Sequence, residues 1–190
     1  NLTIKGIKRI MPKESVTLKI LFETRLPKIS NVRMGTYDST SFFAGYWYPQ
    51  MSVYDDIEGW DINHYSGTQE FYNDFNNYDV EITTGKEFTL WASGVLQNPE
   101  DVFPEVILQR YNSVANTEEI VNIITENDLA LYEELKGKGT NCWKFKAEGT
   151  PDFAFALSDH YLYDLCSYKN KSKENPIVLI GAAYKKNSED

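Results

Sequence analysis

The sequence has few of the residues that build common catalytic centres. It contains only two histidines, His64 and His160, so three histidines of this chain cannot surround a zinc ion. No HExxH, GxSxG, Walker A or glycine-rich dinucleotide motif occurs. A Cys-His nucleophilic pair is formally available, but both cysteines lie in alternating segments typical of core strands. The sequence therefore predicts no catalytic set in this chain, and a satisfied structural role for His160 at a strand edge.

Cysteine is also too scarce for a disulfide scaffold or a thiolate metal site. Cys142 and Cys166 are the only two, and neither belongs to a CxxC pair. Because each lies in an apolar, strand-like run, we expect two buried free thiols, with a disulfide as the alternative.

Long apolar runs and clusters of basic residues are missing as well. No stretch approaches the ~20 apolar residues that cross a bilayer, and no basic start precedes an apolar segment. The net charge is -9, and the 19 basic residues occur singly or in short pairs. These features argue against membrane insertion and against nucleic acid as a partner. The start at Asn1, within strand-like sequence, favours a chain cut from a longer polypeptide, by signal-peptide removal or by design.

The residues that are present predict a folded, mainly β protein. Hydrophobic residues make up 42% and charged residues 25% of the 190, close to globular averages of ~45–50% and ~25%. Apolar alternation predicts a strand at 15–26, and "FFAGYWYP" (42–49) predicts a strand buried on both faces and closed by Pro49. Residues 79–96 predict a hairpin in which Gly85 adopts a positive φ.

The second half of the chain mixes short helices with further strands. Asn98 and Pro99 are typical of a helix start, and Pro104 limits or restarts that helix. A strand is expected at 118–125, a short helix ending at Gly137, two strands split by "EGTPD", and a last buried strand in "PIVLIGAAY". Together these elements predict an antiparallel β-sandwich with short helical insertions.

Two groups of acidic residues are candidates for polar sites. Asp74, Asn76 and Asp79 supply closely spaced oxygens that suit calcium, but they lack the EF-hand pattern. Turn chemistry, in which Asn and Asp bond the nearby backbone, is the preferred interpretation. Asp55 and Asp56 are interpreted in the same way, as turn residues or caps.

Three stretches in chain order carry a family resemblance. They are "STSFFAGYWYPQMSVYDDIEGW", "DFNNYDVEITTGKEFTLWASGVLQN" and "WKFKAEGTPDFAFALSDHYLYD". They resemble, in order and spacing, the N-terminal β-domain of zinc aminopeptidases of the aminopeptidase N and leukotriene hydrolase type (gluzincin metallopeptidases), in a divergent bacterial branch. The first is similar to the segment that runs from a substrate-amine anchor to a Phe-Pro-Cys-Phe-Asp-Glu-Pro signature, which Ala44, Tyr48 and Pro49 fit.

The chain departs from that signature at several positions. Gly45 replaces an arginine, Gln50 and Ser52 stand where a cysteine and the first acid are usual, and the acids follow as Asp55 and Asp56. The family's amine anchor, a Gln or Glu, falls within residues 38–40, where Asp38 is the only acid. The resemblance thus implies Asp38 as the anchor for a substrate ammonium; a salt bridge or turn cap is the alternative.

The resemblance implies a non-catalytic domain, residues 1–175, followed by a last strand and tail, 176–190, that lead towards a catalytic domain. The Gly-x-Met-Glu-Asn loop and the HExxH helix of the family are absent here, so zinc is expected in the full-length protein and no cofactor in this chain. The implied partners are the catalytic domain of the same polypeptide and a peptide substrate. A bacterial envelope or exported location is the expectation from the branch.

The seven aromatic residues of 42–60 are compatible with more than one function. In the family interpretation they are mainly core, and some are exposed only where a partner domain docks. In the alternative, a free-standing β-sandwich module binds carbohydrate through Trp47 and Trp60, with Asp55 and Asp56 on polar groups. A third hypothesis is a protein-interaction domain with no ligand of its own.

Overall fold

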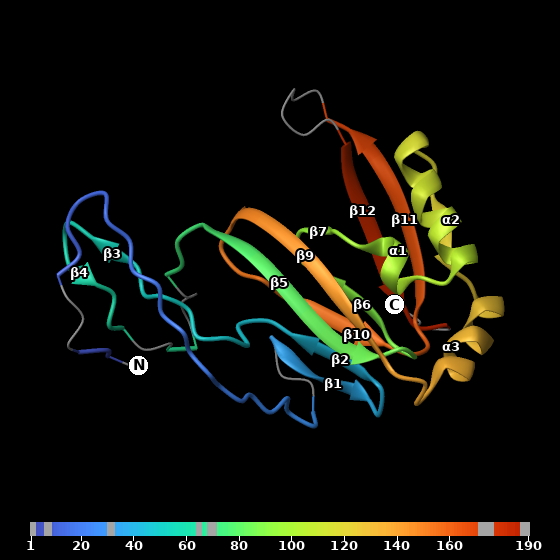
Figure 1. Cartoon of the computed structure of the whole chain (residues 1–190), viewed down its shortest axis with the longest axis horizontal. Helices are drawn as coiled ribbons and strands as arrows, with labels where there is room; N and C mark the ends of the chain where they lie inside the picture. The colour runs from blue at the N-terminus through green and yellow to red at the C-terminus, as the bar shows by residue number, and fades with distance from the viewer. Residues whose placement is uncertain are drawn as a thin grey trace.

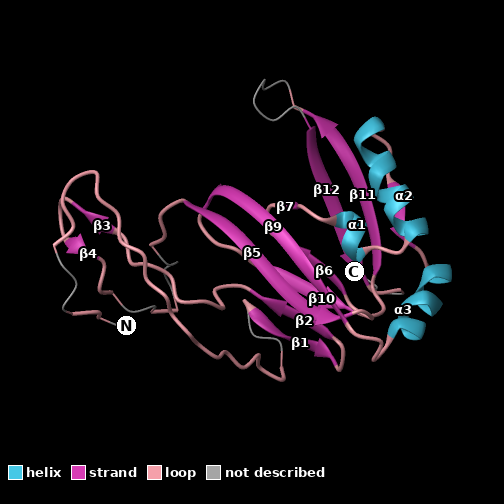
Figure 2. Ribbon diagram, viewed as in Figure 1, coloured by secondary structure: helices cyan, strands magenta, loops and turns pink. Residues whose placement is uncertain are grey.

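The computed structural model describes most of the chain, and its secondary structure is mainly β. The described residues are 3–5, 9–29, 33–63, 66–67, 72–170 and 177–186. They contain antiparallel sheets and a few short helices (Figures 1 and 2). His64 lies outside the described residues. No helix in the described part of the chain is long and apolar enough to cross a membrane.

The largest sheet has four antiparallel strands in the order β1-β2-β10-β6. Its strands are β1 (Met34–Asp38), β2 (Ser41–Ala44), β10 (Phe155–Ser158) and β6 (Thr89–Ala92). β1 and β2 are joined by a tight turn, whereas β10 arrives from the far end of the sequence and pairs with both β2 and β6. This sheet therefore brings together three distant parts of the chain.

A second sheet has the order β5-β9-β7. Its strands are β5 (Asn76–Gly85), β9 (Thr140–Thr150) and β7 (Val95–Leu96). Period-two alternation explains β9, because Trp143, Phe145 and Ala147 are buried while Lys144 and Lys146 are exposed. Both lysines form ion pairs with carboxylates directly opposite on β5.

A third sheet has the order β12-β11-β8, and a small hairpin stands apart. The strands of the sheet are β12 (Ile177–Tyr184), β11 (Leu162–Lys169) and β8 (Val121–Ile124). The hairpin consists of β3 (Tyr54–Asp55) and β4 (Gly59–Trp60), and Figure 1 shows it at the left of the molecule, away from the three larger sheets.

The helices begin and end where local sequence signals predict. α1 (Pro99–Val102) has Pro99 at its first turn, and α2 (Glu105–Ser113) begins directly after Pro104. α3 (Leu129–Leu135) follows a 3₁₀ turn, and Gly137 beyond it has φ +70°, as a helix-ending glycine does. The predicted strand at 118–125 is confirmed as β8.

The core lies among the three larger sheets and the helices. Its fully buried large side chains include Trp143, Phe153, Ile107, Ile123 and Ile124. Aromatic rings meet edge to face there, as for Phe103 and Trp143, whose centroids lie 5.4 Å apart at 83°.

The predicted strand at 15–26 is wrong. These residues form no strand in the structure, and Val16, Leu18 and Ile20 are exposed. A strand needs a neighbouring strand to bond its backbone, and among the described residues no sheet edge pairs with this segment. Apolar and polar residues do alternate in this segment, but among the described residues no strand pairs with it.

The predicted strand at 42–49 is wrong in its extent. β2 ends at Ala44, and Tyr46 adopts φ +51°, which turns the chain out of the sheet. Tyr46, Trp47 and Tyr48 consequently do not alternate between two faces. All three are half-buried, Trp47 and Tyr48 against the core, whereas Tyr54 and Trp60 are exposed. The expectation that the aromatics are core therefore holds only for the first part of the segment.

The predicted hairpin at 79–96 is also wrong. The chain does turn after β5, with the Phe88 N–H donating to the Gly85 carbonyl at 3.1 Å, but Gly85 does not have a positive φ. β5 then pairs with β9, and β6 pairs with β10 in a different sheet. The sequence identified the turn residues, but it did not show which strands pair with each other.

The last strand is present but exposed rather than buried. All eight residues of β12 are exposed, and among the described residues β12 is an outer strand that pairs with β11. The predicted boundary after residue 175 falls between β11 and β12, which pair along the whole of β12.

Candidate functional site

Asp38, the predicted amine anchor, lies in a polar cluster built from two turns and one strand end. We call Asp38, Thr40, Asp159, His160 and Lys185 the Asp38 cluster. Asp38 is the last residue of β1 and Thr40 lies in the turn that follows it, whereas Asp159 and His160 lie in the turn between β10 and β11. Because β2 pairs with β10, the two turns meet at the same end of the sheet. Lys185 follows β12 directly.

His160 is held between two carboxylates. Its Nε2 lies 3.2 Å from Asp38 Oδ2, and its Nδ1 lies 2.6 Å from Asp159 Oδ1. Thr40 Oγ1 donates to the same Asp159 oxygen at 2.6 Å. Both ring nitrogens therefore face acids, and neither is directed at a cysteine sulfur. The expected structural role of His160 is supported, although it lies in a turn and not in a strand.

Asp38 is surrounded by donors and positive charge. The Thr40 N–H donates to Asp38 Oδ1 at 3.0 Å, and the Lys185 ammonium lies 3.6 Å from Oδ2. Burial alone would raise the pKa of Asp38, but the hydrogen bonds from Thr40 and Ser41 and the charges of His160 and Lys185 lower it overall. Asp38 is therefore an ionised carboxylate that caps a turn and pairs with an ammonium. A role in anchoring a substrate stays a prediction.

The signature segment is fixed by a residue that the sequence did not single out. Asp152, in the connection between β9 and β10, accepts hydrogen bonds from Tyr48 Oη at 3.0 Å and Gln50 Nε2 at 2.8 Å through Oδ1. Its Oδ2 accepts from the Tyr46 N–H at 3.1 Å. Burial, followed by the hydrogen bond with Tyr78, raises the pKa of the Tyr48 phenol. Tyr48 is therefore a neutral donor.

Asp152 is a candidate site residue that sequence analysis missed. It lies 104 residues from Tyr48 in the chain, and no motif links the two positions. The local signal was the bend predicted at "EGTPD", which marks a turn but does not identify what the aspartate contacts. Pro49 of the signature is exposed, and Ala44 is fully buried at the end of β2.

The other acidic candidates have structural contacts. Asp55 Oδ1 accepts from the N–H groups of Ile57 at 3.0 Å and Glu58 at 2.8 Å, and these hydrogen bonds, the one from Glu58 first, lower its pKa. The predicted turn role of Asp55 is confirmed, and Asp56 is exposed in the same turn. The hairpin presents Tyr54 and Trp60, exposed by 64% and 54%, with ring centroids 5.1 Å apart.

The suggested calcium ligands do not converge. Asp74 Oδ1 accepts from the Phe75 N–H, and the Asn76 amide donates to the Asp74 carbonyl, which is the predicted turn chemistry. Asp79 lies on β5 and pairs with Lys146 at 3.7 Å. Within the described ranges, no group of three or more His, Cys, Asp and Glu side chains is placed to hold a metal ion.

The two cysteines are free thiols, as expected, and each is half-buried rather than fully buried. Cys142 Sγ lies 4.0 Å from Glu81 Oε2 across the β5–β9 pair. Comparison with known proteins adds nothing to these residues, because no protein-family model, curated protein or solved structure matches this chain.

Proposed function

We propose that this chain is the non-catalytic N-terminal β-domain of a zinc-dependent aminopeptidase. In the intact enzyme it walls one side of the active-site cleft, limits access and helps to place the amino end of the peptide. Zinc and the water that it activates belong to the catalytic domain of the same polypeptide. The observation that carries the proposal is the position of the three stretches that bear the family resemblance.

Those three stretches contribute adjacent strands to one sheet. The first supplies β2, the second β6 and the third β10, and β10 lies between the other two. Phe155 pairs with Ala44 on one side and with Ala92 on the other, so the register is continuous across the sheet. If the three stretches belong to one domain, their strands should lie next to one another. The observed order of β2, β10 and β6 agrees with that expectation and supports the proposal.

The Asp38 cluster supports the role in placing a peptide amine. Asp38 already pairs with a primary ammonium, that of Lys185, and its side chain is 26% exposed. A substrate ammonium would replace Lys185 in that contact and keep the same charge pairing. The finer architecture follows from the same proposal: the packed antiparallel sheets are the layers of a β-sandwich that docks on a catalytic neighbour. An exported or envelope location is part of this proposal.

The test is a binding titration of the isolated chain, followed by nuclear magnetic resonance. The ligands are a tripeptide with a free amino terminus and the same tripeptide with an acetylated one. We expect the free amine alone to shift the resonances of His160 and Thr40, and Asp38→Asn to abolish the shifts. Asp56→Asn, in an exposed turn, is the matched control and should behave as wild type. Equal binding of the two tripeptides, or zinc-dependent hydrolysis of aminoacyl anilides by the isolated chain, would contradict the proposal.

The carbohydrate-binding module is a second candidate because of one observation. Tyr54 and Trp60 form an exposed aromatic pair, as stacking on sugars requires. Trp47 does not share that surface: its indole N–H donates to the Phe153 carbonyl at 2.9 Å, and its ring packs on Phe155. A soluble oligosaccharide in the same titration, with Trp60→Ala as the variant, decides this alternative: saturable binding lost in the variant would favour the module.

A further inference from the structure

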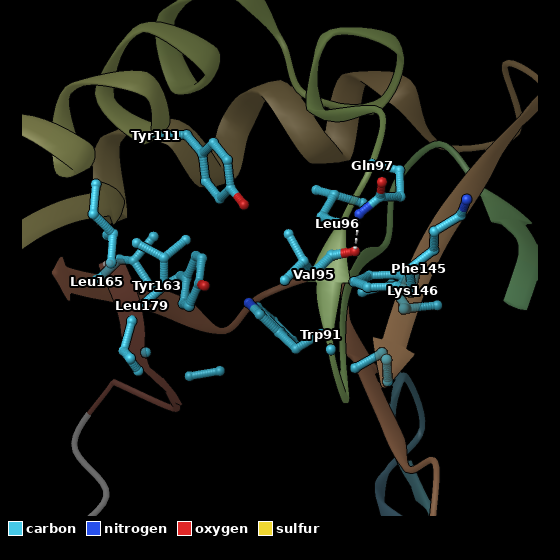
Figure 3. Close-up of a pocket in the computed structure, with 18 of the residues that line it drawn as sticks. Trp91, Val95, Leu96, Gln97, Tyr111, Phe145, Lys146, Tyr163, Leu165 and Leu179 are labelled. Carbon is cyan, nitrogen blue, oxygen red and sulfur yellow. Dashed lines mark hydrogen bonds between the residues drawn. The ribbon is translucent and has the colours of Figure 1, made fainter. Parts of the chain in front are cut away.

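Three sheet edges converge on one mainly apolar hollow, whose polar and charged lining residues include Gln97, Lys146 and Glu148. β6, β7 and β12 are each the terminal strand of their sheet, and residues of all three line a cavity of about 930 Å³ (Figure 3). We call this cavity the wedge; it is lined by Trp91, Val95, Tyr111, Phe145, Tyr163 and Leu179, among others. In Figure 3, Tyr163 and Leu179 lie on one side and Val95 and Phe145 on the other.

β12 borders the wedge with one of its faces. Ile177, Leu179, Gly181 and Ala183 line the cavity from alternate positions of the strand, with Val178 beside them. Among the described residues, β12 bonds to β11 on one side and its other edge is open. An exposed apolar edge strand is a template for pairing with another strand, because its free N–H and C=O groups have no partner in the sheet.

A buried donor in the wedge also lacks a partner. The indole Nε1–H of Trp91 is buried and has no hydrogen-bond acceptor among the described residues. Figure 3 shows this nitrogen directed into the cavity, towards the side of Tyr163. Buried tryptophan N–H groups usually find an acceptor. This orphan donor marks the wedge as a place where the isolated chain leaves a polar group unsatisfied.

The chain also carries a strand pattern without a sheet. In residues 15–21, Val16, Leu18 and Ile20 alternate with polar or exposed neighbours, and all three are exposed. The segment contains one charge, that of Lys19, which is opposite in sign to the net charge of -9. It is nearly as long as β12, which has eight residues.

The segment lies away from the wedge of its own molecule. Just after it, Thr24 Oγ1 donates to the Trp47 carbonyl at 3.0 Å, and the Phe22 ring packs near Trp47 at 6.1 Å. This anchor lies beyond β2, whereas the wedge begins at β6, with β10 in between. In Figure 1 the blue segment runs to the left of the sheets, and β12 lies at the right.

We propose that two copies of this chain form a dimer by reciprocal strand donation. Residues 15–21 of each copy add to β12 of the other, with Val16, Leu18 and Ile20 directed into the wedge. Such an exchange is closed, because each copy gives one strand and receives one. It couples the unpaired segment and the open edge, the two features that the isolated fold leaves unsatisfied.

Sedimentation equilibrium of the full 190-residue chain tests the proposal. We expect a concentration-dependent dimer, and we expect Ile20→Lys to weaken it by about tenfold or more, because a charge would enter the apolar wedge. Leu21→Lys is the matched control on the opposite face of the same segment, where the side chain is 88% exposed, and it should leave the dimer unchanged. Circular dichroism checks that both variants keep the fold.

A mixing experiment tests reciprocity. Leu179→Lys damages the wedge and leaves the donor segment intact, whereas Ile20→Lys does the reverse. At a protein concentration between the dissociation constants of wild type and variant, each variant alone should be mainly monomeric, and an equimolar mixture should form more heterodimer, through its one intact pair, than either variant forms homodimer. A monomer at every concentration, a dimer equally sensitive to Ile20→Lys and Leu21→Lys, or open-ended oligomers would each overturn reciprocal donation.

Discussion

Asp152 fixes the signature segment through three hydrogen bonds from different donors. Replacing it with alanine would leave the Tyr46 N–H and the Tyr48 hydroxyl without that acceptor in a half-buried environment. We expect Asp152→Ala to lower the free energy of unfolding by about 1–3 kcal/mol. Urea denaturation measures this change. Asp56→Ala, in an exposed turn, should stay within about 0.5 kcal/mol of wild type, and an equal loss in both variants would rule out the anchoring role of Asp152.

Asp128 gives the fold an acid-sensitive ion pair. Its side chain is 7% exposed and accepts from Arg110 at 2.5 Å and from the Thr125 N–H at 2.8 Å. Burial would raise the pKa of Asp128, but the Arg110 and Thr125 hydrogen bonds lower it overall. A lowered folded-state pKa means that the unfolded chain binds the proton more tightly. The stabilisation is thus complete near neutral pH and is lost as the pH falls below about 4.

Asp128→Asn isolates this contribution. The variant should lose about 2 kcal/mol at neutral pH, because a partly buried Arg110 is left without its carboxylate. The difference from wild type should shrink as the pH falls through the acid range, as followed by urea denaturation at a series of pH values. Asp79→Asn, whose ion pair with Lys146 is exposed, should show little effect at any pH. A difference for Asp128→Asn that does not depend on pH would contradict the titration argument.

At the scale of elements, Gly94 allows the chain to pass from one sheet to another. It lies between β6 and β7, has φ +84°, and a Cβ there would overlap the carbonyl oxygen of Lys146. We expect Gly94→Ala to cost about 3 kcal/mol, from the left-handed backbone and from the steric overlap together. Gly137→Ala separates the two causes: its φ is +70° and no atom lies within 4 Å of the added Cβ, so about 1 kcal/mol is expected. Thermal unfolding of both variants measures the difference, and equal costs would exclude the overlap.

The helices could be predicted from the sequence because their signals are local. Pro99, Pro104 and Gly137 act within one turn of themselves, and the structure has helix boundaries at each. Strand pairing depends on residues far away. The sequence around Gly85 resembles a hairpin turn, yet β5 finds its partner about sixty residues later in β9.

The candidate site shows the same limit. Asp38 could be singled out as the only acid at its motif position, but its partner His160 lies in a turn that only the β2–β10 pairing brings close. No sequence motif identified Asp152 as a residue of the site. A single sequence thus identified one acidic residue of the site but not the side chains that fix its charge and geometry.

At the scale of the whole molecule, order should be unevenly distributed. Residues 9–29 form no helix or strand, and most of their apolar side chains are exposed, whereas β5 and β9 pair over almost their full length around buried Trp143. Hydrogen exchange should therefore be fast in 9–29 and slowest in β9. Mass spectrometry of the dilute protein measures both. Protection of 9–29 equal to that of β9 in dilute solution would contradict the unpaired state of this segment.

The sheet topology also determines when the protein can fold. β2 pairs with β10 and β5 pairs with β9, so two of the three larger sheets need strands that lie far apart in the sequence. Contacts so distant in the chain are slow to form, because long loops must close before any pairing stabilises them. During synthesis, β2, β5 and β6 leave the ribosome long before β9 and β10. Their apolar faces stay without partners in that interval, and we expect chaperones to bind the nascent chain until its last third has been made.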